Sequence, residues 1–302
     1  DLDHFYSIVG VEYVFTDSES LNSYSHDETE DFKYFPEVVI KPNTTEQVAA
    51  IMLYCSKHQI SVTPCGARTG LSGGSLPVCG GVVLSTERFN NIIEIDERNL
   101  QATVEPGVIN QTFQETVQAK GLFYPPDPAS KGSCFLGGNL AENSGGPKAL
   151  KYGVTKDYVI NLEVVLANGE IIWTGANVLK NSTGYNLTQL LVGSEGTLGI
   201  ITAATIQLFP LPKEKVVLWA SFKDFSQVLG FYKNINNRFK DLITSFEFMN
   251  KESIEVLEKH ECKIINLKKN QCYCLVEFSN FQKISEAQAQ SSHYLYGDNI
   301  LK

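Results

Sequence analysis

The sequence lacks several features that would assign a chain to a large class at once. No apolar run approaches the ~20 residues that a membrane-spanning helix needs. Basic residues are not in surplus: 25 lysines and arginines stand against 34 aspartates and glutamates, for a formal net charge of -9. Because phosphate-backbone binding needs a lysine and arginine surplus, this balance argues against a nucleic-acid-binding protein.

Cysteines and the chain start also lack a recognisable pattern. The seven cysteines are odd in number and irregularly spaced, with neither a disulfide framework nor a zinc-ligand spacing. The start, Asp1 to Tyr6, is acidic and polar, without a basic patch followed by an apolar stretch, so no signal peptide is visible. We therefore expect reduced cysteines, no metal site, no transmembrane segment, and a cytoplasmic protein that is either free or peripheral to a membrane.

What is present indicates a folded α+β protein. With 43% hydrophobic and 20% charged residues, the composition is typical of globular proteins, and 302 residues suffice for two cores. Thr44 and Gln47 form a capping-box pattern, Gly121 is a helix-stop signal, and Asn168-Gly169 is a strong hairpin turn. The alternation of apolar and polar residues predicts strands at 37–42, 60–64, 81–85, 92–96, 101–105, 159–166, 170–173 and 200–209, and helices at 44–58, 110–120 and 187–192.

The pattern changes after two prolines, Pro210 and Pro212. Beyond them, an α+β arrangement with its own core is expected. Its predicted order is strand 216–222, helix 225–233, strand 243–249, helix 253–259 and strand 271–278. We therefore expect one domain over residues 1–212, with a subdomain break near 100–125, and a second, partial domain over 213–302.

Three segments carry chemistry, and the first is residues 64–75, PCGARTGLSGGS. Consecutive backbone N–H groups in such a loop can form a nest for an anion, and glycine lets the backbone approach phosphate oxygens closely. The segment lacks the Lys-Ser/Thr ending of a nucleotide P-loop and the G-x-G-x-x-G spacing of a Rossmann fingerprint. Taken alone, it is equally compatible with a flexible surface loop.

The second segment, residues 124–153, contains YPPDP at 124–128 and GGNLAENSGG at 137–146 and shows no helical or strand period. Its small residues let the backbone approach a flat ligand. Asn139, Asn143 and Ser144 can bond a heterocycle edge or a phosphate. Ordinary turn chemistry is the alternative, and for this segment alone it is the better interpretation.

The third segment comprises KNSTGYNL at 180–187 and GSEGTLGIIT at 193–202. Glu195 lies between two glycines just before a buried strand, where its carboxylate can accept hydrogen bonds from ribose hydroxyls. The Ile201 backbone can pair with an adenine edge. The alternative is a turn whose glutamate faces water.

In order and spacing, the three segments together resemble the FAD-binding domain of the vanillyl-alcohol oxidase (PCMH-type) superfamily. The resemblance is strongest to the branch that contains the glycolate oxidase flavin subunit, D-lactate dehydrogenase and D-2-hydroxyglutarate dehydrogenase, and it covers about residues 30 to 212. It implies an α+β fold with a PCMH-type FAD-binding domain of two α+β subdomains, followed by a partial ferredoxin-like α+β cap domain.

The resemblance also implies a set of cofactor-binding residues and a reaction. The loop from Gly66 to Gly73 would wrap the FAD pyrophosphate, a middle group would line the flavin and ribityl chain, and Glu195 with Ile201 would hold the adenosine end. The implied residues are Cys65, Gly66, Ala67, Arg68, Thr69, Gly70, Gly73, Pro126, Asp127, Ser133, Gly137, Gly138, Asn143, Ser144, Gly153, Glu195 and Ile201. The implied enzyme is an FAD-dependent oxidoreductase that transfers hydride from a D-2-hydroxy acid to flavin N5.

Two departures from the family pattern concern the first loop, where Cys65 replaces a common arginine and Arg68 a common small or amide residue. Arg68 could reach a phosphate or a substrate carboxylate, or it could face solvent. Some relatives attach FAD through a histidine in this loop. Here Thr69 holds that position and no histidine lies between His58 and His260, so FAD is expected to be non-covalent.

No catalytic base or substrate clamp is assigned. The histidine-rich metal motif and the Glu-His-Gly motif of the resembled enzymes are absent, and residues 296–299 (YGDN) resemble the first only faintly. The resembled enzymes are also longer. Expected partners are a 2-hydroxy acid of the D-lactate or glycolate type and an electron-acceptor protein or quinone. The alternatives are an electron-relay subunit, an FAD oxidase of another alcohol, and a nucleotide-phosphate binder without flavin.

Overall fold

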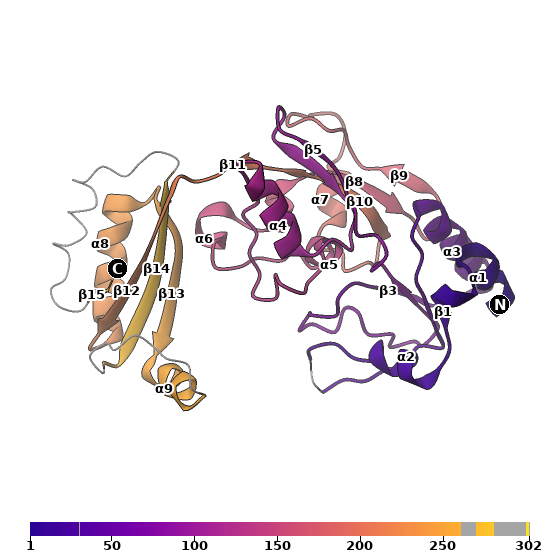
Figure 1. The fold of residues 1–302 in the computed structure, drawn as a ribbon, viewed down its shortest axis with the longest axis horizontal. Helices are drawn as coiled ribbons and strands as arrows, with labels where there is room; N and C mark the ends of the chain where they lie inside the picture. The colour runs from indigo at the N-terminus through magenta and orange to yellow at the C-terminus, as the bar shows by residue number, and fades with distance from the viewer. Residues whose placement is uncertain (30, 261–269, 281–299, 302) are drawn as a thin grey trace. The chain divides into compact units, whose positions relative to one another are not determined.

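A computed structural model describes residues 1–29, 31–260, 270–280 and 300–301 (Figure 1). The chain divides into two compact units. The first contains residues 1–144 and 154–209, and the second contains 145–153 and 210–302. The sequence motif at 296–299 lies outside the described residues. No helix in the described ranges is both long and apolar enough to cross a membrane.

The first unit begins with a four-stranded sheet in the order β1-β2-β4-β3. Its strands are β1 (Val14–Phe15), β2 (Val38–Ile40), β3 (Val62–Cys65) and β4 (Val82–Ser85). β4 pairs in parallel with both β2 and β3, whereas β1 runs antiparallel to β2. A parallel pair needs a crossover, and α3 (Thr45–His58) supplies the one between β2 and β3.

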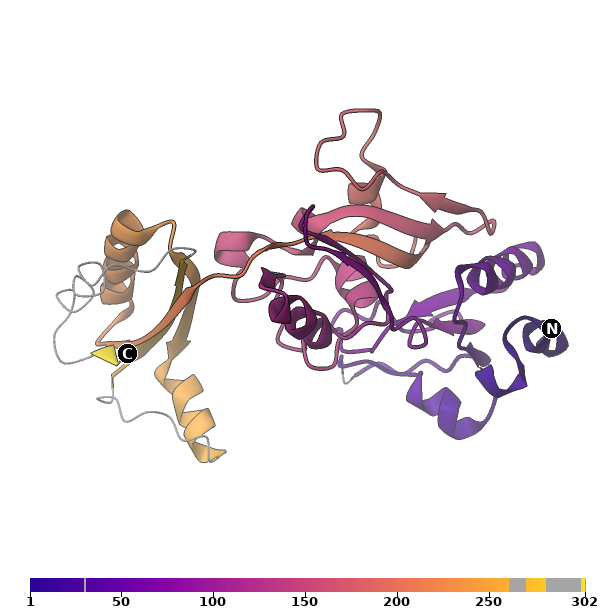
Figure 2. The same ribbon diagram turned by 45° about the horizontal axis from the view of Figure 1, so that its top comes forward.

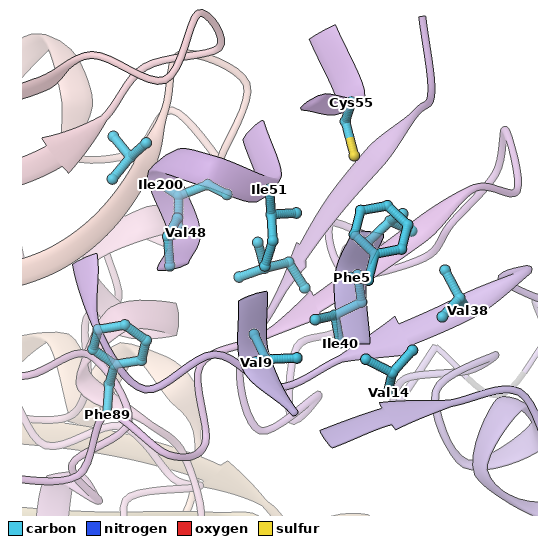
Figure 3. Close-up of a cluster of buried hydrophobic side chains, with 13 residues drawn as sticks. Phe5, Val9, Val14, Val38, Ile40, Val48, Ile51, Cys55, Phe89 and Ile200 are labelled. Carbon is cyan, nitrogen blue, oxygen red and sulfur yellow. The ribbon is translucent and has the colours of Figure 1, made fainter. Parts of the chain in front are cut away.

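The cap of α3 confirms the local prediction. The Thr44 side chain accepts a hydrogen bond from the Gln47 backbone at 3.2 Å. Val48, Ile51 and Cys55 then lie on the buried face of the helix, in a cluster with residues from β2, β4 and the N-terminal helix (Figure 3). Full burial of an aliphatic side chain stabilises a fold by about 1.5–3 kcal/mol, so this cluster anchors α3 to the sheet.

The N-terminal residues are more ordered than their polar sequence indicates. Helix α1 (Leu2–Val9), the 3-10 helix η1 (Val11–Tyr13) and helix α2 (Ser18–Ser23) precede β2. Phe5 and Val9 of α1 are both buried in the same core as α3. The apolar positions of this short helix are too few for the sequence period to reveal, but they are enough to dock it.

A five-stranded antiparallel sheet in the order β5-β6-β10-β8-β9 completes the first unit. Its strands are β5 (Ile92–Asp96), β6 (Gln101–Val104), β8 (Val159–Val165), β9 (Ile171–Trp173) and β10 (Ile200–Gln207). The predicted Asn168-Gly169 turn joins β8 to β9, with Gly169 at φ 82° and Asn168 Oδ1 accepting from the Glu170 backbone at 3.0 Å. The segment 174–186 projects from this sheet as a loop (Figure 2).

The expectation of an irregular segment over 124–153 is wrong in part. Helix α5 (Leu136–Glu142) and the single turn α6 (Ala149–Tyr152) lie within it. Two successive glycines oppose helix formation by about 1 kcal/mol each, which hides α5 from the sequence pattern. Tertiary contacts compensate, because Leu136 and Leu140 are fully buried. The remaining elements of this region are α4 (Asn110–Ala119), β7 (Leu122–Phe123), η2 (Thr155–Tyr158), α7 (Leu187–Leu191) and β11 (Phe209–Pro210).

The second unit is built on an antiparallel sheet in the order β13-β14-β12-β15. Its elements are β12 (Glu214–Phe222), α8 (Phe225–Phe239), β13 (Ile243–Asn250), α9 (Lys251–Lys259), β14 (Cys272–Asn280) and β15 (Ile300–Leu301). Val228, Phe231 and Ile235 of α8 pack with the inward residues of the sheet. α8 is six residues longer than predicted, because Ile235 extends the apolar face through an asparagine-rich stretch of low helix propensity.

Candidate functional site

A cavity of about 550 Å³ lies within the first unit, in the range of small-molecule and cofactor sites. The three segments singled out in the sequence all contribute to its walls. Of the predicted site residues, the walls contain Cys65, Gly66, Ala67, Arg68, Thr69, Gly70, Gly137, Gly138, Ser144, Glu195 and Ile201. The structure therefore brings together residues that are more than a hundred positions apart.

The first wall is the loop that follows β3. The strand ends at Cys65, whose carbonyl accepts a hydrogen bond from the Thr86 backbone at 3.0 Å. Beyond it the chain turns sharply, with Arg68 at φ 60°, a left-handed conformation that non-glycine residues adopt rarely. The turn places six consecutive residues, 66–71, along the cavity.

Helix α5 forms the second wall. A Cβ built on Gly137 would lie 2.5 Å from Pro106 Cβ, so only glycine allows this close packing of the helix. A Cβ on the neighbouring Gly138 would meet nothing within 4 Å, because this residue faces open space. Asn139 is buried and donates from Nδ2 to Asn110 Oδ1 at 3.1 Å. Asn139 therefore fixes the helix, and Gly138 leaves room for a ligand.

The third wall is the turn before β10, and backbone bonds hold it against the end of α5. Gly193 N donates to the Leu140 carbonyl and Glu195 N to the Ala141 carbonyl, both at 3.0 Å. A Cβ on Gly196 would lie 2.8 Å from Pro64 Cγ, so this turn also packs closely on β3. The glycines around Glu195 therefore allow close packing on α5 and β3, and the segment is not simply an exposed turn.

All three segments meet at Gly74. A Cβ there would lie 3.1 Å from Glu142 Oε1 and 3.2 Å from Glu195 Oε2. Ser72 Oγ donates to the Glu142 carboxylate at 2.9 and 3.1 Å, which ties the first loop to α5. Glu142 and Gly74 were not predicted as site residues. Both lie in the glycine-rich segments, but no local pattern shows that these segments meet here, because the contacts span about seventy positions of sequence.

Several further wall residues were not among the predicted site residues. Ser75, Ser130 and Ser194 lie within the three segments singled out in the sequence. Glu28, Thr86 and Pro106 lie outside those segments and are brought to the cavity by the fold.

Six predicted residues are not among the cavity walls: Gly73, Pro126, Asp127, Ser133, Asn143 and Gly153. Some have structural contacts of their own. Asp127 forms an ion pair with Lys131 at 2.7 Å, and Asn143, at φ 52°, accepts from the Lys156 backbone at 2.9 Å. Gly153 ends α6 and belongs to the second unit. Their roles toward a cofactor stay predictions.

A charged network lies behind the first loop. Lys41 Nζ contacts Glu87 Oε1 at 2.5 Å, and the Tyr24 hydroxyl donates to Glu87 Oε2 at 2.7 Å. Burial acts to raise the pKa of Glu87, but the bonds from Lys41 and Tyr24 outweigh it and leave that pKa lowered. The Glu87 carboxylate is therefore a stable anion with both oxygens engaged.

Cys65 is buried in the same wall. Burial raises the pKa of its thiol to about 11, so the side chain is protonated at neutral pH. A protonated thiol is a poor nucleophile, because the thiolate is the reactive form. Among the described residues, no group of three histidine, cysteine, aspartate or glutamate side chains is placed to hold a metal ion.

The walls fit a dinucleotide with a flat ring system. Glycine backbone lines the cavity on two sides, from the 66–70 loop and from α5, and at Gly138 it faces open space. The carboxylate of Glu195 is suited to hydroxyl groups rather than to phosphate. The cavity thus combines a glycine-rich loop, an open backbone position on α5 and a carboxylate.

Comparison with known proteins agrees with this geometry. Residues 36–175 match the family model described as FAD binding domain. Over 237 residues the chain is 46% identical to "Glycolate oxidase subunit GlcD" of Bacillus subtilis (strain 168), covering 78% of this chain and 50% of that relative. It is 40% identical to a D-lactate dehydrogenase of Anaerostipes hadrus over 239 residues, covering 78% of this chain and 50% of the relative.

Other relatives extend the comparison. A D-2-hydroxyglutarate dehydrogenase of Stutzerimonas stutzeri (strain A1501) is 36% identical over 255 residues, which cover 84% of this chain and 54% of the relative. A solved alkyldihydroxyacetonephosphate synthase aligns with a TM-score of 0.82 at 20% identity, covering 97% of this chain and 57% of that one. This structural likeness confirms the α+β fold.

The chain spans about half the length of the relatives it matches. Within that span, the matched region contains two of the three segments and the loop, helix and sheet that carry them. Residues 36–175 therefore match an FAD binding domain, and the chain is similar over most of its length to about half of proteins named glycolate oxidase subunit, D-lactate dehydrogenase and D-2-hydroxyglutarate dehydrogenase.

Proposed function

We propose that the chain binds FAD in the cavity of the first unit and takes part in the oxidation of a D-2-hydroxy acid. The convergence of the three glycine-rich segments on one cavity carries this proposal. The names of the similar proteins support the reaction class. D-Lactate and glycolate are the first substrates to test, because the two relatives with 46% and 40% identity bear those names.

The roles of the walls follow from their chemistry. Backbone N–H groups of residues 66–70 are suited to the pyrophosphate, since successive amides form an anion nest. Gly137, Gly138 and Ser144 would lie along the flavin and its ribityl chain. Glu195 and Ile201 would hold the adenosine end. The remaining predicted residues around 126–133 and Asn143 would shape the cavity from behind.

We further propose that FAD is held without a covalent bond. No histidine lies among the residues of the cavity walls, and Thr69 occupies the position where some relatives carry one. The Cys65 thiol is kept protonated by burial and is therefore unsuited to attack a flavin. Bound flavin supplies the hydride acceptor for the reaction. An electron-acceptor protein or a quinone would then remove the electrons.

The chain's own part in the reaction is binding and orientation. Oxidation of a hydroxy acid also needs a base for the hydroxyl proton and a cationic clamp for the carboxylate. The described residues are assigned neither role. We keep the division into a cofactor domain over 1–212 and a substrate domain over 213–302 as a proposal, with a cytoplasmic location.

Anaerobic reduction tests the proposal. The protein is saturated with FAD, and D-lactate, L-lactate, glycolate and D-2-hydroxyglutarate are added separately while the visible flavin band is followed. Bleaching by a D-2-hydroxy acid or glycolate, without bleaching by L-lactate, is the expected result. A bound flavin that no hydroxy acid reduces would shift the function to an electron relay or to another alcohol. A protein that binds no flavin would overturn the proposal altogether.

A further inference from the structure

The backbone conformation of Arg68 is unfavourable for a residue that carries a side chain. At φ 60° it occupies the left-handed region, where a non-glycine residue is disfavoured. Glycine would be the easier choice in a loop that already contains several. Because the loop retains arginine at its sharpest turn, the side chain is expected to contribute an interaction that offsets the backbone cost.

The guanidinium of Arg68 lies on an aromatic ring. Its Cζ is 4.2 Å from the centroid of the Tyr24 ring, within the range of a cation–π contact. Tyr24 is itself buried and held by its hydroxyl, which donates to Glu87 Oε2 at 2.7 Å. The ring is therefore a fixed support. No local pattern indicates this stacking, since Tyr24 precedes Arg68 by more than forty residues.

The Arg68 guanidinium forms no ion pair within the described part of the chain. One of its nitrogens lies 4.0 Å from the Cys65 sulfur. Glu87 interacts with Arg68 electrostatically, but Lys41 and Tyr24 occupy its two oxygens. A partly buried cation without a directly bonded carboxylate is suited to bind an external anion.

Arg68 also lines the cavity, between Ala67 and Thr69 of the anion-nest loop. We propose that the Arg68 guanidinium, supported by the Tyr24 ring, binds the pyrophosphate of the dinucleotide held in this cavity. Arginine suits this role because its planar group donates two parallel hydrogen bonds to phosphate oxygens. The inference rests on the proposed binding of FAD and adds a side-chain cation to a site otherwise built from backbone amides.

The favoured anion is a pyrophosphate rather than a substrate carboxylate. The guanidinium sits on the same loop whose glycines allow backbone amides to converge on phosphate oxygens. Lys41 and Tyr24 engage the two oxygens of Glu87, so this carboxylate does not bond the guanidinium directly. A dianionic pyrophosphate would satisfy both the loop amides and the unpaired charge.

The test compares FAD with riboflavin, which lacks the pyrophosphate and the adenosine. Dissociation constants of FAD and riboflavin are measured for the wild-type protein, Arg68→Gln and Arg68→Lys, by quenching of flavin fluorescence at low and high salt. For Arg68→Gln we expect FAD affinity to fall on the order of 10- to 100-fold, the range of a charge-assisted hydrogen bond. Riboflavin affinity should stay unchanged, and Arg68→Lys should restore part of the FAD affinity.

The role of the Tyr24 ring under the Arg68 guanidinium is tested with two variants of Tyr24. Tyr24→Leu removes the ring and should weaken FAD binding by about 2- to 30-fold, as expected for a partly desolvated cation–π contact. Tyr24→Phe keeps the ring face and loses the hydroxyl with its bond to Glu87, so it should bind FAD more tightly than Tyr24→Leu. In the Arg68→Gln background, Tyr24→Leu should have little further effect, because the two residues act together.

The outcomes separate this inference from the proposed function. A wild-type protein that binds no FAD contradicts the proposed function. Wild-type binding that Arg68→Gln leaves unchanged, with the same salt dependence, overturns the role of Arg68 alone. Equal losses for FAD and riboflavin would make Arg68 a support of the loop and also overturn it. Unchanged FAD affinity with a raised KM for the hydroxy acid would assign the guanidinium to the substrate carboxylate instead.

Discussion

The two units of the chain differ in where their backbone is strained. Among the described residues, the five non-glycine residues with positive φ all belong to the first unit, and three of them, Arg68, Asn143 and Glu195, lie in the segments around the cavity. The described part of the second unit contains none. Such conformations cost about 1–3 kcal/mol each and persist where the surroundings over-determine them. In the first unit, three of these unfavourable conformations shape the cavity. In the described part of the second unit, apolar packing forms the fold without them.

The same contrast appears in the side chains. The second unit buries Phe222, Phe231 and Val276 in one continuous apolar cluster. The cavity walls instead consist of glycine backbone, hydrogen bonds between distant segments, and an arginine that has no ion-pair partner in the described ranges. Substitutions in the core of the second unit should therefore lower the free energy of unfolding more than FAD affinity. Substitutions that face the cavity should lower FAD affinity more than the free energy of unfolding.

The largest effect on stability is expected from the core of the second unit. Phe231→Ala removes a fully buried ring and should lower the free energy of unfolding by about 3–5 kcal/mol. FAD affinity should change little, because the cavity walls come from the first unit and none of the described residues of the second unit lines them. Urea unfolding and FAD titration measure the two quantities. The control is Phe225→Ala on the same helix, where the ring is half exposed; comparable losses in both variants would contradict the packing account.

Neighbouring glycines of α5 provide the sharpest test of the cavity wall. Gly137→Ala places a Cβ against Pro106 and should destabilise the fold by about 1–3 kcal/mol. Gly138→Ala meets no protein atom and should leave the fold as stable or slightly more stable, because alanine favours a helix. It should nevertheless weaken FAD binding by narrowing the cavity. Tight FAD binding by Gly138→Ala would place the flavin elsewhere.

The network of Lys41, Tyr24 and Glu87 should make the free energy of unfolding depend on pH in the acidic range. The folded-state pKa of Glu87 lies below its ordinary 4.5, so its ionised form stabilises the fold at neutral pH. That contribution, about 1 kcal/mol for a half-buried pair, is lost as pH falls below 4.5 through the lowered pKa. Glu87→Gln should flatten this part of the pH profile of urea unfolding. An unchanged acid slope in the variant would show that Glu87 is not the group responsible.

The smallest effect is expected at the tie between the first loop and α5. Ser72→Ala removes the hydroxyl that donates to Glu142 and should cost about 0.5 kcal/mol, because both groups are exposed. Its main effect should be faster amide hydrogen exchange in residues 66–74. Ser23→Ala, which loses a bond within α2 only, is the matched control and should leave exchange in that loop unchanged.

Local signals made much of the fold predictable. The cap of α3, the turn at Asn168-Gly169 and the stop at Gly121 each depend on neighbouring residues, and the structure confirms all three. The glycine-rich segments were likewise recognisable from their own composition. Their meeting in one cavity was an inference from the resemblance, since nothing local brings Gly66 to Gly138.

What the sequence could not reveal depends on long-range contacts. Helix α5 forms against its own propensity because Gly137 packs on Pro106 and Asn139 bonds Asn110. The support of Arg68 by Tyr24 joins residues from a loop and from the end of a helix forty positions earlier. Such pairings follow from the folded arrangement of the sheets, and no period or motif of one segment encodes them.

Titration of the protein with FAD is the direct test of the proposed cofactor site. The visible absorption band of bound flavin is followed for the wild-type protein and for Gly138→Ala. We expect saturation at one FAD per chain for the wild type and clearly weaker binding for the variant, although both are equally folded by urea unfolding. A folded wild-type protein that takes up no FAD, or a variant that binds as tightly, would contradict the proposed site.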